Sequence, residues 1–287
     1  MSLIWTEKET PKEIMDGAIE KYDLDTLYVL YSGGKDSVCV VHYIAKNYPK
    51  LFKGTVFTNV GLSAQATRKF VLSYCKKMNW PLDMTWAHAD RERFYNIAMR
   101  WGFASPGNHR IWMGYLKQHT WYYFLKERIA EGKKCAFISG VRKKESDPRN
   151  KFRKYTKKPV DVNATQVYIK PFLYKNGIQL WEYFNKNELE KTPVYEWLNR
   201  SGECHCGAFA EPWDLQMLKI HDPFAFESIK WLEKEIDLHG SKEAKLRNKW
   251  GTKVGTDDVI NQKTLDEIFD GVIEINDDLC GESCVVS

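Results

Sequence analysis

The residues with the clearest chemical potential are six consecutive ones, Ser-Gly-Gly-Lys-Asp-Ser at positions 32–37. They lie between a short apolar run at 26–31 and a segment at 36–47 whose apolar residues recur at helical spacing. A helix N-terminus leaves backbone N–H groups unpaired and carries partial positive charge, so it binds phosphates. Gly33 and Gly34 allow the backbone to approach an anion closely, while Ser32, Lys35 and Ser37 add donors and a cation. The pattern therefore predicts a phosphate-binding loop. It is not a Walker A loop, because that motif's spacing is absent.

A second polar segment follows another predicted strand. Gly140 and Arg142 stand in Ile-Ser-Gly-Val-Arg-Lys-Lys-Glu-Ser, residues 138–146, directly after the apolar run 135–139. In an open α/β sheet, ligands bind beyond the carboxyl ends of the strands. We therefore expect both polar segments to line one site, with Lys35 at a solvent-open strand end.

Four cysteines outside the predicted core form a further candidate site, and they are Cys204, Cys206, Cys280 and Cys284. Their C-x-C and C-x-x-x-C spacings differ from the usual zinc-knuckle spacing, and four thiolates can hold an iron–sulfur cluster. Thiols that relay sulfur, a structural zinc site and unrelated free thiols remain alternatives. The other three cysteines stand in apolar contexts typical of a core, and they are Cys39, Cys75 and Cys135.

Charge is unevenly distributed along the 287 residues. Residues 133–158 hold eleven Lys and Arg against two acids, whereas residues 257–282 hold nine acids and one Lys. A dense basic segment is either a solvated loop or a surface for a nucleic-acid backbone. In the second case Phe152 and Tyr155 could stack on bases, and the cations that would contact the backbone are Lys151, Arg153, Lys154, Lys157 and Lys158.

The elements that must position these residues alternate along the chain. Strands are predicted at 26–31, 54–58, 82–86, 135–139 and 166–170. Helices are predicted at 11–22, 36–47, 63–78, 90–101 and 111–131, followed by shorter ones at 177–187, 194–200, 213–220 and 223–238. Such alternation predicts an α/β fold with a mostly parallel, doubly wound sheet. Residues 239–256 lack periodicity and are interpreted as a linker or mobile loop.

The loop at 32–37 resembles the PP-loop of the ATP pyrophosphatases, and Gly140-Val-Arg142 through Ser146 resembles a segment of their phosphoadenosine phosphosulfate (PAPS) reductase-like branch. Lys170-Pro171-Phe172, Pro193-Val194-Tyr195 and the cysteines that follow are also similar in order to that branch. The resemblance implies an adenine nucleotide alpha hydrolase-like domain over 26–210, preceded by an N-terminal helix within 1–25 and followed by a helical and acidic extension, 211–287. Within the branch, the chain is nearest in character to members that insert sulfur into nucleic acid, as in DNA phosphorothioation.

The resemblance also implies an activity. ATP and Mg²⁺ are the expected ligands, and a [4Fe-4S] cluster on the four cysteines is a further candidate cofactor. The expected catalytic residues are Lys35, Asp36 and Arg142, and the expected nucleotide-binding residues are Ser32, Gly33, Gly34, Lys35, Asp36, Ser37, Thr58, Gly140 and Arg142. ATP would adenylate an acceptor, either DNA or tRNA, so that sulfur from a cysteine desulfurase can replace AMP.

Two other functions stay open. A PAPS or adenosine phosphosulfate (APS) reductase would release sulfite, and a non-catalytic scaffold would keep only the fold. The retained Lys35 favours ATP, because a lysine placed for a leaving pyrophosphate has no such role in a reductase. No apolar stretch approaches the ~20 residues that span a bilayer, and the N-terminus lacks a secretory pattern. The expected location is therefore the cytoplasm.

Overall fold

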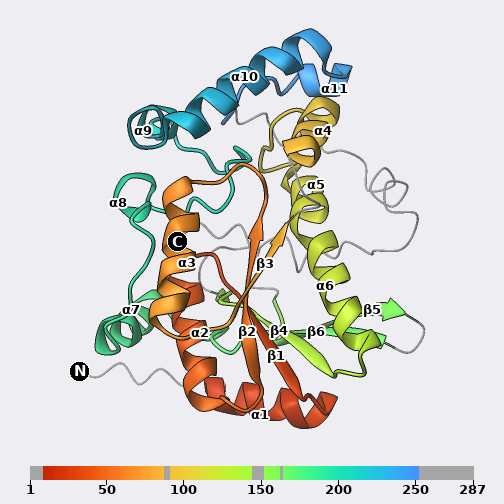
Figure 1. The fold of residues 1–287 in the computed structure, drawn as a ribbon, viewed down its shortest axis with the longest axis vertical. Coiled ribbons are helices and arrows are strands. Elements are labelled where there is room, and N and C mark those ends of the chain that lie inside the picture. The colour runs from red at the N-terminus through yellow and green to blue at the C-terminus, as the bar shows by residue number, and fades with distance from the viewer. Residues whose placement is uncertain (1–8, 87–90, 144–151, 162–163, 252–287) are drawn as a thin grey trace.

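The sheet is the centre of the fold (Figure 1). The computed structural model describes residues 9–86, 91–143, 152–161 and 164–251. Six strands lie in the order β3-β2-β1-β4-β6-β5, and all neighbours are parallel except β5 and β6. The strands are β1 (Thr26–Leu30), β2 (Phe52–Asn59), β3 (Leu82–Trp86), β4 (Cys135–Ile138), β5 (Tyr155–Asp161) and β6 (Ala164–Ile169). The predicted α/β class with a mostly parallel sheet is confirmed.

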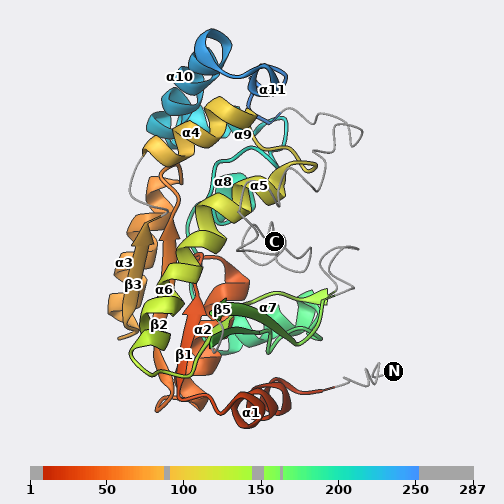
Figure 2. The same cartoon turned by 90° about the vertical axis from the view of Figure 1, so that its right-hand side faces the viewer.

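Helices cover both faces of the sheet, as the two views show (Figures 1 and 2). Those of the sheet region are α1 (Pro11–Tyr22), α2 (Lys35–Asn47), α3 (Gln65–Lys77), α6 (His119–Ala130) and α7 (Gly177–Lys186). Apolar residues of α1, α2, α3 and α7 share one core cluster with the strands, while α6 packs in a separate cluster with β4 and β6. Burial of both faces explains why β1 reads as a continuous apolar run.

A second group of helices lies beyond the carboxyl ends of the strands, where α4 and α10 run side by side (Figures 1 and 2). Its members are α4 (Arg91–Trp101), α5 (His109–Met113), α8 (Tyr195–Leu198), α9 (Asp214–His221), α10 (Pro223–His239) and α11 (Lys242–Lys245). They share a core cluster with the segment that follows β2 and with Cys206. The helical C-terminal part therefore packs against the edge of the sheet where the ligand site is expected.

Three expectations about elements differ from the structure. The single helix expected at 111–131 is divided into α5, a π-helix η1 (Gly114–Gln118) and α6. The basic segment is not only a loop, because β5 forms within it. The interpretation of 239–256 as a linker is wrong over its described part, where α11 forms and Trp250 is buried and donates to the carbonyl of His205 at 2.8 Å. Among the described helices, none is long and apolar enough to cross a bilayer.

Candidate nucleotide site

The loop between β1 and α2 needs both of its glycines. Gly33 has φ +77°, and a Cβ there would lie 3.2 Å from a methyl group of Val71. A Cβ on Gly34 would lie 2.8 Å from the hydroxyl of Tyr195. Gly33 therefore provides a left-handed turn, and neither position has room for a side chain. The backbone N–H groups at the start of α2 are thus not covered by a Cβ atom, as an anion-binding loop requires.

The serines of the loop hold its shape. Ser37 Oγ donates to the carbonyl of Gly34 at 2.9 Å and accepts from the N–H of Ser32 at 3.2 Å. The hydroxyls of Ser32 and Ser37 lie 3.0 Å apart. No described side chain caps α2, whose N-cap is Gly34. The first turn of the helix therefore keeps N–H groups available for a ligand.

Asp36 gathers two cations at the start of α2. Arg142 Nε donates to Asp36 Oδ2 at 2.8 Å, and Lys35 Nζ lies 3.2 Å from Asp36 Oδ1. Arg142 comes from the segment after β4, where Gly140 is so close to the loop that its Cβ would lie 3.0 Å from the carbonyl oxygen of Asp36. The structure thus brings together the two polar segments that the sequence places about a hundred residues apart.

Lys35 differs from expectation. It is not at a solvent-open position, because it is only 5% exposed, and its ammonium lies 4.6 Å from the ring centroid of Trp181 in α7. The aromatic face and Asp36 hold the ammonium beside the cleft rather than in its lining. Trp181 had no predicted role, since nothing local to it signals a neighbour 146 positions earlier.

A second lysine, also missed by the sequence analysis, approaches the same ring. Lys191 Nζ lies 5.4 Å from the Trp181 centroid and 4.2 Å from that of Tyr195. Burial and the nearby charge of Lys35 lower the pKa of Lys191. The backbone N–H of the next residue, Thr192, donates to the carbonyl of Gly33 at 2.9 Å, which fixes this segment against the loop.

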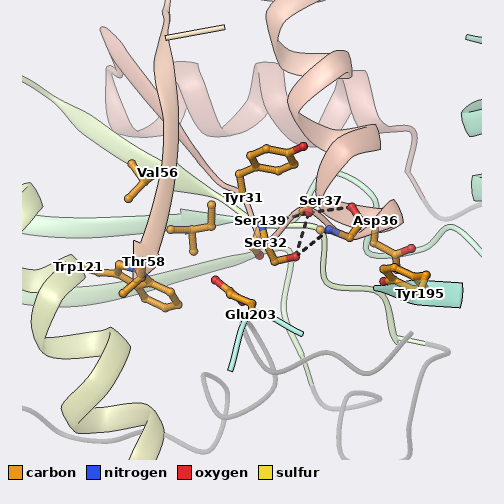
Figure 3. Close-up of a pocket in the computed structure, with 13 residues that line it drawn as sticks. Tyr31, Ser32, Asp36, Ser37, Val56, Thr58, Trp121, Ser139, Tyr195 and Glu203 are labelled. Atoms are coloured by element: carbon orange, nitrogen blue, oxygen red, sulfur yellow. Dashed lines mark hydrogen bonds between the residues drawn. The ribbon is translucent and has the colours of Figure 1, made fainter. Parts of the chain in front are cut away.

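A cleft lies at the carboxyl ends of β1, β2 and β4 (Figure 3). Thr58 is at its apolar side, where its hydroxyl accepts from Trp121 Nε1 at 2.9 Å. The lining residues are Leu30, Tyr31, Ser32, Gly34, Asp36, Ser37, Val56, Thr58, Trp121, Ser139, Gly140, Tyr195 and Glu203. The predicted nucleotide-binding residues that line the cleft are Ser32, Gly34, Asp36, Ser37, Thr58 and Gly140. Arg142 does not line the cleft but donates a hydrogen bond to Asp36, which does. Sequence reasoning missed Trp121, Ser139, Tyr195 and Glu203.

The structure describes two of the four candidate cysteine ligands. Cys204 is half-buried and Cys206 is buried, and the described residues hold no group of three or more His, Cys, Asp or Glu side chains arranged for a metal ion. Cys280 and Cys284 lie outside the described residues, so the four-cysteine site stays a prediction. His205 between the two is fully buried, burial lowers its pKa to about 3, and neither ring nitrogen has a hydrogen-bond partner within the described part of the chain. Cys39, Cys75 and Cys135 are buried as expected.

The basic segment is divided in the structure. Arg153 and Lys157 are exposed, whereas Lys154 forms an ion pair with Glu9. Phe152 was expected to be able to stack on bases but is 3% exposed and packs with Val141 and Leu173. Tyr155 donates to the carbonyl of Ile14 at 2.8 Å. Lys151 and the side chain of Lys158 lie outside what the structure describes. A nucleic-acid surface here stays a prediction that rests on the cations, without Phe152.

Comparison with known proteins places this geometry in a family. Residues 26–207 match the model described as "Phosphoadenosine phosphosulfate reductase domain". The chain belongs to this family. The match begins at β1 and ends just after Cys206, so it includes the whole cleft. Among curated proteins, none matches the chain significantly.

Several solved structures are similar to this chain at low sequence identity. PAPS reductase from Candida auris, in a phosphate complex, has a TM-score of 0.46 at 15% identity, over 66% of this chain and 85% of that one. FMN adenylyltransferase from Candida glabrata, with FMN and an ATP analogue, has 0.44 at 14%, over 68% and 65%. The U34-tRNA thiolase NcsA from Methanococcus maripaludis, with its [4Fe-4S] cluster, has 0.38 at 13%, over 82% and 84%.

Proposed function

We propose that this member of the PAPS reductase family is an ATP pyrophosphatase that adenylates an acceptor for sulfur insertion. The observation that carries the proposal is the surplus of cations at the loop. Lys35 and Arg142 both contact one carboxylate, Asp36, at the positive end of α2, and Lys191 lies near enough to Lys35 for the Lys35 charge to lower the pKa of Lys191. Such a surplus suits a polyphosphate better than the single phosphoryl group at the reacting end of PAPS.

The reaction follows from this charge distribution. The acceptor oxygen attacks the α-phosphorus of ATP, the bond from that phosphorus to its bridging oxygen breaks, and pyrophosphate leaves with the bridging oxygen. Backbone N–H groups at the start of α2 and the ammonium of Lys35 stabilise the charge that develops on pyrophosphate. Arg142 keeps Asp36 oriented through the 2.8 Å bond.

The residues present also fit Mg²⁺. Asp36 lines the cleft, and its Oδ1 is buried and accepts no hydrogen bond among the described residues. A carboxylate oxygen is the ligand that Mg²⁺ prefers, so Asp36 would hold the ion against the phosphates. When bound, Mg²⁺ would neutralise phosphate charge.

Sulfur would enter in the second half of the reaction. A cysteine desulfurase would load one of the four cysteines with a persulfide, whose outer sulfur displaces AMP from the acceptor. A second thiol then cleaves the new S–S bond, which leaves sulfur on the acceptor and a disulfide between the two cysteines. The acceptor is nucleic acid, as DNA backbone or a tRNA base, and the reaction belongs to the cytoplasm, where these thiols stay reduced.

One experiment separates the open functions. The protein is incubated with ATP and Mg²⁺, with and without DNA or tRNA, while pyrophosphate and AMP are measured; a parallel sample receives PAPS and reduced thioredoxin, and sulfite is measured. Pyrophosphate from ATP supports the proposal. Sulfite from PAPS would identify a reductase instead, and turnover of neither would identify a scaffold.

A further inference from the structure

One residue that lines the cleft, Glu203, belongs to a buried ion pair that the proposed reaction does not use. Lys117 Nζ donates to Glu203 Oε2 at 2.8 Å, and the two residues are 1% and 7% exposed. Lys117 belongs to the π-helix η1, and such turns are frequent at functional sites. Taking two charges out of water is costly, and a buried pair often stabilises a fold no more than apolar residues would. A role in ligand recognition would account for its presence here.

The position of Glu203 in the cleft indicates what it would contact. Figure 3 shows its carboxylate pointing into the cleft, between Thr58 and Trp121 on one side and Ser32 on the other. The side of Ser32 is the start of α2, which suits phosphates. The opposite side holds Trp121 and Val56, which suit the apolar faces of a base. In a nucleotide the ribose joins these two parts, so the carboxylate faces the sugar.

We propose that Glu203 selects a nucleotide whose ribose hydroxyls are free and rejects one that carries a 3′-phosphate. This inference rests on the nucleotide site of the proposed function. A carboxylate accepts hydrogen bonds from ribose hydroxyls but repels a phosphate on the same sugar, the logic by which an acidic residue distinguishes NAD from NADP in dinucleotide-binding folds. Glu203 therefore favours ATP, or APS, over PAPS, although the chain belongs to a family named after PAPS.

The discrimination against a 3′-phosphate depends on the carboxylate of Glu203, whose partner is Lys117. Glu203 lines the cleft and Lys117 does not, so the carboxylate stands between the ammonium and any ligand. While Glu203 is ionised, its carboxylate balances the charge of Lys117 and is the negative end of the pair that faces the cleft. An amide in its place would keep the size and an oxygen for Lys117, but it would remove the negative charge that faces the cleft, so a 3′-phosphate would no longer be repelled.

The test compares two ligands that differ only at the 3′ position. AMP and adenosine 3′,5′-bisphosphate are titrated calorimetrically into the wild-type protein, Glu203→Gln and a control, Asp214→Asn. Asp214 is a fully buried carboxylate paired with Arg200. It is eleven positions from Glu203 and outside the cleft lining, so its replacement tests a structural defect without the proposed role. Thermal unfolding of each variant confirms that it is folded.

Wild-type protein is expected to bind AMP about tenfold or more tightly than the bisphosphate, and Glu203→Gln is expected to bring the two affinities close to each other. Asp214→Asn should keep the wild-type ratio. Equal affinity of the wild-type protein for both ligands, or preference for the bisphosphate, would overturn the inference. So would a Glu203→Gln variant that loses affinity for both ligands equally. Selective AMP binding without ATP cleavage would overturn the proposed function and leave this inference standing, whereas binding of neither ligand would overturn both.

Discussion

Replacement of Lys35 by methionine tests the central step of the proposed reaction. Methionine keeps most of the apolar stem that packs on Trp181 and removes the ammonium 4.6 Å from the ring centroid. Alanine is a poorer choice, because Lys35 is 5% exposed and its truncation would leave a cavity. The change therefore separates the charge from the packing.

The expected magnitudes differ for stability and for catalysis. Asp36 keeps its 2.8 Å bond to Arg142, so no buried charge loses its last partner. The lost cation–π contact is worth about 0.5–2 kcal/mol, which lowers the Tm by a few degrees. A preorganised charge at the transition state is worth about 2–4 kcal/mol, so pyrophosphate release should fall about 30- to 1000-fold.

The assay measures pyrophosphate release from ATP and Mg²⁺ together with the thermal unfolding midpoint. Lys46→Met is the matched control, since Lys46 is an exposed lysine in the last turn of the same helix. It should keep wild-type activity and stability. A folded Lys35→Met variant that releases pyrophosphate at the wild-type rate would refute the assignment of the loop.

Four further outcomes are expected. Arg142→Gln should lower the free energy of unfolding by about 3 kcal/mol, the lower end for breaking a buried pair because Lys35 still approaches Asp36, as urea titration would measure; an unchanged midpoint would contradict the pairing. Burial raises the pKa of the Cys75 thiol to about 11 and that of Cys135 to about 12, so at pH 8 both stay protonated, and mass spectrometry of iodoacetamide-treated native protein should find both unmodified; alkylation of either in folded protein would contradict its burial. Anaerobically purified protein should be brown and contain iron; colourless, iron-free protein after reconstitution would leave zinc or free thiols. Neutral replacement of Lys151, Arg153, Lys154, Lys157 and Lys158 should reduce the slope of log Kobs for nucleic-acid binding against log salt concentration by a few units, while ATP cleavage is retained. An unchanged slope would show that the segment is only a solvated surface.

The parts of the fold that the sequence predicts correctly are those encoded locally. The run at β1 is apolar because both faces of the sheet are covered, and the glycines that follow are required by the turn itself, as φ +77° at Gly33 shows. Strand β5 was missed for a related reason. It contains Lys157, Lys158 and Pro159 in place of an apolar run, and charges and proline are typical of strands at the edge of a sheet.

The parts of the site that were missed depend on distant contacts. Glu203 stands in a stretch dominated by glycine and cysteine, and its partner Lys117 is 86 positions away on a turn expected to be ordinary helix. The loop composition predicts that Lys35 is near an anion, but the direction of its side chain depends on Trp181, which the fold brings in from α7. Residue type therefore indicates the chemistry, while tertiary packing decides where the charged atom lies.

The way Asp36 holds two cations explains how the site can be strongly positive before its ligand arrives. Arg142 and Lys35 contact different oxygens of the carboxylate. A guanidinium is a planar, rigid donor, and Arg142 comes from a segment fixed by the close approach of Gly140 to the loop. An ammonium on a four-carbon stem is a mobile point charge that can exchange one anionic partner for another. In the proposed reaction, Lys35 would therefore be the cation that exchanges Asp36 for a phosphate. Arg142 would keep the carboxylate in place, and Asp36 Oδ1 would then be the oxygen available to Mg²⁺.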